Sequence, residues 1–384
     1  MTEQQPPAAL SQSTPALPLT GKQIIIAKTG LQNVIDALAT AGYTVIGPTV
    51  RQEAIVYDEI SQVEDLPIGW IDEQGPGHYR LRERADDRVF GFVVGPHTWK
   101  KYLYPSRLSL FRTSQNGSLT IDASQEVPQY AFIGARACEL AAIAIQDRIF
   151  LEGPYHDPHY KARRERAFIL AVNCTEPAAT CFCASMGTGP VNTSGFDLSL
   201  TELDDAFLLT IGSDAGAEML SGCDWRLASA YELNQAQRLL DQATGSMGRA
   251  MQTDDLPGLM YDNLEHPRWE ETAKRCLSCM NCTLVCPTCF CVDVQDVSDL
   301  TGQQTERVRV WDSCFNPDFS YIHGGNLRPN IRARYRQWLT HKLGSWVDQF
   351  GSSGCVGCGR CITWCPVGID LTEEVAAIRG EQLS

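Results

Sequence analysis

Two stretches, CLSCMNCTLVCP at residues 276–287 and CVGCGRCITWCP at residues 355–366, repeat one pattern of four cysteines followed by a proline. The pattern C-x2-C-x2-C-x3-C-P is the ligand run of bacterial-type 4Fe-4S proteins, in which one tight turn supplies three thiolates. Structural zinc sites instead pair two C-x2-C knuckles around one tetrahedral ion. The two runs therefore predict two 4Fe-4S clusters.

The fourth cysteine of each run predicts how the two runs are joined. In two-cluster ferredoxins this cysteine ligates the cluster of the other run. We therefore expect an exchange of ligands that ties the runs together and sets the clusters close enough for electron transfer. The first cluster is expected on Cys276, Cys279, Cys282 and Cys365, and the second on Cys355, Cys358, Cys361 and Cys286.

A candidate third site combines Cys138 with three cysteines of NCTEPAATCFCASMGTGP, residues 173–190, namely Cys174, Cys181 and Cys183. Proline and glycine in this loop let the backbone fold around a cluster and donate N–H groups to its sulfides. Cys138 follows a predicted strand, and strand ends in an α/β sheet gather at one edge. We expect a third 4Fe-4S cluster here; the alternative is that the four cysteines are small buried apolar residues.

Three more cysteines, Cys289, Cys291 and Cys314, are alternative metal ligands close to the two runs. The tetrapeptide TCFC occurs at residues 180–183 and again at 288–291, where it follows directly on the first run. The competing interpretation is again that these are buried apolar residues. Cys223 stands alone in SGCDW, and we expect it to be inert.

Charge and hydropathy exclude several classes of function. The formal net charge is −14, which argues against a nucleic-acid-binding protein because such a protein needs a basic face. No apolar run approaches the roughly 20 residues that span a bilayer, and no export signal is present, so we expect no membrane partner. Sixteen cysteines then indicate a reducing cytoplasm, where thiolates bind metals.

The pattern of predicted elements indicates an α+β multidomain chain. Residues 1–20 read as a disordered tail. Residues 21–225 alternate strands with helices, which favours an N-terminal α/β domain, with strands expected at 54–60, 89–95, 130–135, 166–173 and 206–212. Residues 226–384 have helical stretches, including NIRARYRQWLTHKLGSWVDQF at 330–350 between the two runs. We expect a mainly helical, ferredoxin-like domain with two clusters there.

No catalytic residue is predicted. The glycine-rich stretches MGTGPVNTSG and IGSDAG match neither dinucleotide-binding nor phosphate-loop patterns, and the seven histidines form no metal-binding pair at helical spacing.

A resemblance adds to this interpretation. The segments RACEL, NCTEPAATCFCASMGTGP, CLSCMNCTLVCPTCFCVDV, RVWDSCF and CVGCGRCITWCP together resemble the beta subunit of cytoplasmic nickel–iron sulfhydrogenases and its close relative, the corresponding iron–sulfur subunit of anaerobic sulfite reductase. The resemblance runs over most of residues 130–370 and is more specific than the cluster motifs, which plain ferredoxins share. It also raises the expectation of the third cluster, because RAC, NC and CFC are shared.

The family implies a non-catalytic, electron-transfer iron–sulfur subunit of a multi-subunit oxidoreductase. Electrons would pass between a flavin-containing, NAD(P)H-reactive partner and a catalytic partner, either a nickel–iron hydrogenase or a siroheme sulfite reductase. The sequence does not distinguish these catalytic partners, nor NADH from NADPH. A redox-sensing protein that binds partners is the competing class, although no DNA-reading element is visible. A reductase that binds substrate at an open-coordinated cluster is a third.

Overall fold

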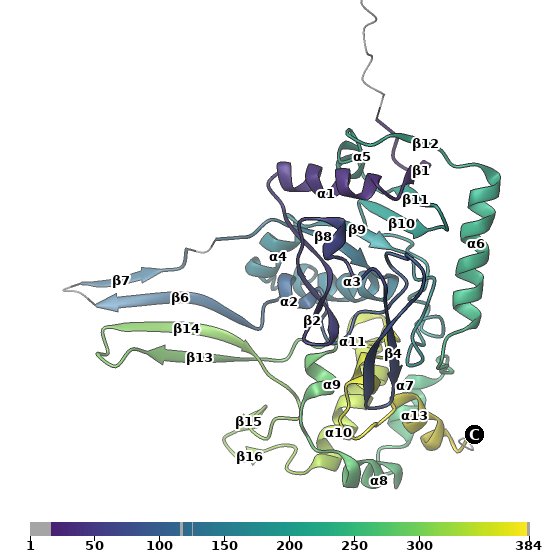
Figure 1. Ribbon diagram of the computed structural model, residues 1–384. Helices are drawn as coiled ribbons and strands as arrows, with labels where there is room; N and C mark the ends of the chain where they lie inside the picture. The colour runs from purple at the N-terminus through teal and green to yellow at the C-terminus, as the bar shows by residue number, and fades with distance from the viewer. Residues whose placement is uncertain (1–16, 116–117, 125, 382–384) are drawn as a thin grey trace, which may run out of the picture.

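The computed structural model describes residues 17–115, 118–124 and 126–381, so most of the tail expected at residues 1–20 lies outside the described residues. The described chain mixes helices with an eight-stranded sheet, a four-stranded sheet and two two-stranded sheets (Figure 1). The predicted mixed α and β architecture is therefore confirmed.

The eight-stranded sheet has a parallel centre and antiparallel edges. Its central strands β10, β9, β8 and β2 are parallel neighbours, and every residue of β9 is buried. Continuous apolar strands are typical of parallel sheets that are covered on both faces. In spatial order the strands are β12 (Trp225–Leu227), β1 (Gln23–Ala27), β11 (Ala206–Ile211), β10 (Leu198–Glu202), β9 (Phe168–Val172), β8 (Tyr130–Ala135), β2 (Thr44–Arg51) and β3 (Ala54–Glu59).

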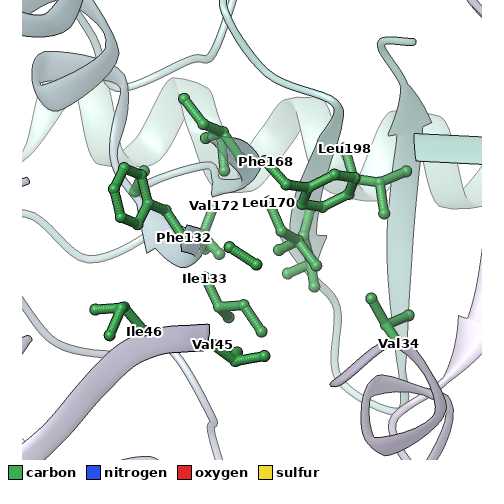
Figure 2. Packing of buried hydrophobic residues seen from close by; sticks show 14 of the residues in the cluster. Val34, Val45, Ile46, Phe132, Ile133, Phe168, Leu170, Val172 and Leu198 are labelled. Carbon is green, nitrogen blue, oxygen red and sulfur yellow. The ribbon is translucent and has the colours of Figure 1, made fainter. Parts of the chain in front are cut away.

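Helices with apolar residues at helical spacing pack on this sheet. In α1, Leu31, Val34, Ile35 and Leu38 recur every three or four residues and are all buried. Figure 2 shows Val34 in one core with side chains of β2, β8, β9 and β10. The helices of this half are α1 (Gly30–Thr40), α2 (Lys100–Leu103), α3 (Ala137–Leu151), α4 (Pro158–Arg164) and α5 (Asp214–Glu218).

One expected strand is wrong. Residues 89–95 are buried but not in a strand, because side chains take their backbone hydrogen bonds. The carboxylate of Glu202 accepts from the N–H groups of Val89 and Phe90, each at 2.8 Å. The Arg136 guanidinium donates to the carbonyls of Phe90 and Phe92. The apolar composition predicted burial correctly, but burial alone does not require a ladder partner.

The second half of the chain is built around short helices that surround the two cysteine runs. Trp269, Phe315, Tyr335 and Trp338 lie in its apolar core, which Phe182 of the first half also joins. The helices are α6 (Ala230–Gly245), α7 (Leu256–Asp262), α8 (Arg268–Arg275), α9 (Asn281–Leu284), α10 (Ile331–Thr340), the π-turn η2 (His341–Ser345), α11 (Trp346–Phe350), α12 (Arg360–Thr363) and α13 (Leu371–Arg379).

A four-stranded antiparallel sheet projects from the body as an arm (Figure 1). It pairs β14 (Gln304–Trp311) with β6 (Arg107–Gln115), and their hairpin partners β13 (Val292–Ser298) and β7 (Leu119–Asp122) form its edges. The expectation that residues 226–384 are mainly helical does not include this hairpin. Its partner strand β6 lies far away in the sequence, so no local pattern predicts the pairing. The division at residues 225 and 226 stays a prediction, and the arm crosses it.

The remaining elements are small. They are the hairpins β4 (Trp70–Gly75) with β5 (His78–Glu83) and β15 (Tyr321–Ile322) with β16 (Gly325–Asn326), and the 3-10 turn η1 (Val63–Asp65).

Candidate metal centres

The two cysteine runs fold into the same backbone shape. Ser278 and Gly357, each two residues after the first cysteine, have φ of 54° and 63°, and both donate their N–H to that cysteine's Sγ at 3.4 Å. Met280 and Gly359 have φ of 69° and 72° and start the one-turn helices α9 and α12. The repeat in sequence is therefore also a repeat in structure.

The first thiol group consists of Cys276, Cys279, Cys282 and Cys365, which line one cavity together with apolar side chains. Burial raises the pKa of the Cys282 thiol well above its usual value, and the neighbouring thiols Cys276, Cys365 and Cys279 raise it further. The Sγ of Cys365 accepts from the N–H of Ile369 at 3.3 Å. Cys365 of the second run thus lies with three cysteines of the first.

The second thiol group consists of Cys355, Cys358, Cys361 and Cys286. Burial raises the pKa of the Cys361 thiol, and the first three thiols that act on it are Cys355, Cys358 and Cys286. Cys286 also acts on Cys355 and Cys358. Both fourth cysteines therefore lie with the opposite run, as the expected exchange of ligands requires, while ligation itself stays a prediction.

The third thiol group, Cys138, Cys174, Cys181 and Cys183, is gathered by the sheet. Cys138 follows the end of β8 and Cys174 follows the end of β9, and these two strands are parallel neighbours. Arg136 ties the two strand ends together by donating to the carbonyl of Asn173 at 3.2 Å. The Cys181 thiol has Cys174 and Cys183 as neighbours, and the Cys138 thiol has Cys183. The structure therefore brings the four predicted thiols near one another.

The three thiol groups adjoin in a row. Cys358 of the second group acts on Cys138, Cys181 and Cys183 of the third. Cys286 acts on Cys282 of the first. The loops touch as well, because the N–H of Phe182 donates to the carbonyl of Gly357 at 2.8 Å. The second group therefore lies between the other two.

The donor set fits iron–sulfur clusters better than single ions. Within residues 17–115, 118–124 and 126–381, no three His, Cys, Asp or Glu side chains are arranged to hold one metal ion. Thiolates around a cubane bind different irons and stand farther apart than the ligands of one ion. The N–H donors to Cys276, Cys355 and Cys365 are the kind of hydrogen bond that tunes cluster potentials.

Two charged residues near the thiols are not predicted by the cysteine patterns. Lys342, in the predicted helix between the runs, donates to the Sγ of Cys286 at 3.3 Å. Arg360, in the middle of CVGCGRC, forms a fully buried ion pair with Glu139 at 2.7 Å and lies near Cys358 and Cys138. A basic residue inside or between cluster runs is the signal that could identify them, since clusters are anionic.

The remaining cysteines separate into two kinds. Cys289, Cys291 and Cys314, here called the spare thiols, lie beside the second thiol group, where the Cys289 thiol contacts that of Cys286. Cys223 lies in the core of the eight-stranded sheet, and its thiol donates to the carbonyl of Gly30. No helix in the described part of the chain is long and apolar enough to cross a membrane.

Comparisons with known proteins agree with this geometry. A family model described as a 4Fe-4S dicluster domain matches residues 275–369. The chain is similar to the sulfhydrogenase 2 subunit beta of Pyrococcus furiosus, with 30% identity over 342 residues that cover 87% of this chain and 92% of that protein. No solved structure matches the chain. The C-terminal part of the chain is thus a 4Fe-4S dicluster domain.

Proposed function

Because the chain belongs to the sulfhydrogenase beta-subunit family, we propose that it is an iron–sulfur electron-transfer subunit that relays electrons between two partner subunits. One partner contains flavin and reacts with NAD(P)H, and the other is a nickel–iron hydrogenase. The similarity to a sulfhydrogenase subunit favours the hydrogenase over a siroheme sulfite reductase. The observation that carries the proposal is the row of three adjoining thiol groups.

In this proposal the first and second thiol groups each hold one 4Fe-4S cluster through the exchanged ligands Cys365 and Cys286. A bound cluster takes up and releases one electron at a time. The chain's own residues hold the four thiolates in place and exclude water from them. The N–H groups of Ser278, Gly357 and Ile369 and the ammonium of Lys342 stabilise negative charge on the thiolates they contact.

The third thiol group holds a third cluster and extends the relay to one end. What supports this is the position of its thiols beside Cys358. The other end of the row reaches the surface at Cys279, which is exposed next to Leu277, a side chain that is 62% exposed. Electrons therefore pass from the third group through the second to the first, or in reverse, and a partner subunit docks over Cys279.

Metal analysis of anoxically purified protein tests the cluster assignment. Two clusters require about eight irons and eight acid-labile sulfides per chain, and three require about twelve of each. Stoichiometric zinc without labile sulfide would contradict the assignment. A count of eight would retain the relay but remove its third station.

Activity and co-purification test the role as a relay. The isolated, cluster-loaded chain should pass electrons from a reduced viologen to an artificial acceptor, but should oxidise neither hydrogen nor NAD(P)H. An affinity-tagged chain expressed in its native host should co-purify with nickel and flavin. NADPH oxidation by the pure, flavin-free chain would refute a purely electron-transferring role.

A further inference from the structure

We propose that the spare thiols Cys289, Cys291 and Cys314 bind an additional iron–sulfur cluster beside the second thiol group. This site lies outside the three groups used above. It rests on the proposed function only in that the chain must acquire iron–sulfur clusters at all.

The base of the β13–β14 hairpin brings the spare thiols together. Val292 pairs with Trp311 at the open end of this hairpin, so the residues just outside it, Cys291 and Asp312, meet as well. The N–H of Asp312 donates to the carbonyl of Cys291 at 2.9 Å. The Cys314 thiol then lies within hydrogen-bonding distance of the Cys291 thiol, and the N–H of Cys314 also points to it. Two cysteines 23 positions apart in sequence therefore face one another (314 − 291).

Cys289 closes the group on the side of the second thiol group. Its thiol contacts that of Cys286, and both Cys289 and Cys291 act on the same buried ammonium, that of Lys100. The spare thiols are partly or largely buried. A cluster held by them would therefore lie against the second group, within easy reach of electron exchange.

Two buried lysines face this site without carboxylate partners. Lys100 is 4% exposed and Lys342 is 3% exposed. Among the described residues, neither ammonium lies within ion-pair distance of an Asp or Glu. Lys100 lies over the Trp311 ring at 4.1 Å and donates to the carbonyl of Cys289 at 3.0 Å, while Lys342 contacts the Sγ of Cys286. A buried ammonium needs a nearby negative charge to offset its lost hydration.

The charge requirement favours a cluster over other uses of the spare thiols. Neutral thiols, or a disulfide between Cys291 and Cys314, would supply no negative charge to either lysine. A cluster in the second thiol group accounts for Lys342, which contacts its ligand Cys286. Lys100 is turned toward Cys289, and an anionic cluster on the spare thiols supplies its counter-charge. Three thiolates leave one iron without a cysteine ligand, so a non-cysteine ligand completes this cluster.

Iron counting on the full chain tests the site. The triple variant Cys289→Ser/Cys291→Ser/Cys314→Ser should lose about three to four irons and a similar number of labile sulfides relative to the unmodified chain. It should also lose one Mössbauer or EPR component while it keeps those of the first and second groups. The matched control Cys223→Ser, in the sheet core, should lose no iron.

A second variant removes dependence on folding of the triple variant. Lys100→Met should leave the iron count unchanged but shift the midpoint potential of one EPR component to a more negative value. Equal iron in the triple variant and the unmodified chain would overturn the site, as would mass-spectrometric alkylation of all three spare thiols in loaded protein. In either case eight or twelve irons would still be present, so the relay proposed above would stand while this cluster fell.

Discussion

Ser278 and Met280 occupy the left-handed region of the backbone, where residues with side chains are uncommon. The second run places glycine at both equivalent positions, Gly357 and Gly359, which adopt this conformation without steric cost. Strain of about 1–2 kcal/mol at each non-glycine position persists because other contacts hold it. The Ser278 hydroxyl donates to the carbonyl of Phe315 at 3.1 Å, and its N–H donates to Cys276.

The position of Cys286 gives a sharp test of the exchanged ligands. Cys286→Ser should perturb the cluster of Cys355, Cys358 and Cys361, because its thiol lies with theirs. The cluster nearest in sequence should keep its spectrum. EPR of the dithionite-reduced variant, with Cys365→Ser as the reciprocal control, separates the two clusters. Loss of the signal assigned to Cys276, Cys279 and Cys282 in Cys286→Ser would contradict the exchange.

Lys342 should tune the potential of the second cluster. Its ammonium lies 3.3 Å from the Sγ of Cys286 and favours the reduced, more negative state of an attached cluster. Lys342→Met should lower that midpoint potential by about 60 mV, equivalent to ~1.4 kcal/mol for one electron. A redox titration followed by EPR measures the shift. Lys161→Met, at an exposed surface pair with Glu165, is the control and should change nothing.

At the scale of elements, the loop of the second run interlocks with the loop of the third thiol group. The Thr188 hydroxyl donates to the carbonyl of Val356 at 2.7 Å, and the hydroxyls of Thr180 and Thr363 lie 2.9 Å apart. A Cβ at Gly357 would lie 2.6 Å from the Cα of Cys183. Glycine is therefore required here for close approach of two backbones as well as for its positive φ.

Gly359→Ala should separate these loops. An added Cβ would lie 2.4 Å from the carbonyl oxygen of Thr180, so overpacking adds to the strain of the left-handed conformation. We expect a loss of about 3 kcal/mol in stability and lower iron content. Gly351→Ala is the matched control, since its φ is 68° and no atom lies within 4 Å of the added Cβ. It should cost about 1 kcal/mol by anoxic urea unfolding and keep all iron. Equal losses would show that the loops do not press on one another.

At the scale of the whole molecule, two apolar cores support the thiol groups. The core of the eight-stranded sheet consists almost wholly of aliphatic and aromatic side chains. The second core contains Cys355, and Cys276, Cys282, Cys361 and Cys365 pack against it. Its stability must therefore depend on what those cysteines bind.

Removal of iron should consequently unfold one part of the chain first. Chelation under anoxic, reducing conditions should abolish hydrogen-exchange protection around residues 276–286 and 355–365, since metal binding there contributes to folding. Strands β8 and β9 should keep their protection because their buried neighbours are apolar. Hydrogen exchange followed by mass spectrometry resolves the two regions. Uniform loss across both would mean that the sheet does not fold independently of the clusters.

Local spacing in the sequence was enough to predict the cysteine runs, the members of each thiol group and most of the strands and helices named above. These features depend on distances within one turn or one element, where local geometry is decisive. Cys365 and Cys286 could be assigned to opposite runs because a duplicated motif implies a duplicated fold. The positions of Cys138 and Cys174 after β8 and β9 likewise indicated that these two cysteines meet.

How these pieces adjoin depends on the packed fold alone. The contact of residues 180–183 with Gly357 and Gly359 places the third thiol group against the second, and no pattern in either segment indicates it. The arm depends on pairing β14 with β6, and residues 89–95 left the expected strand because Glu202 and Arg136 take their hydrogen bonds. Lys100 and Lys342 reach the thiols in the same way. Each of these contacts joins residues far apart in the chain, so its energy arises only once the chain is folded and leaves no local trace in the sequence.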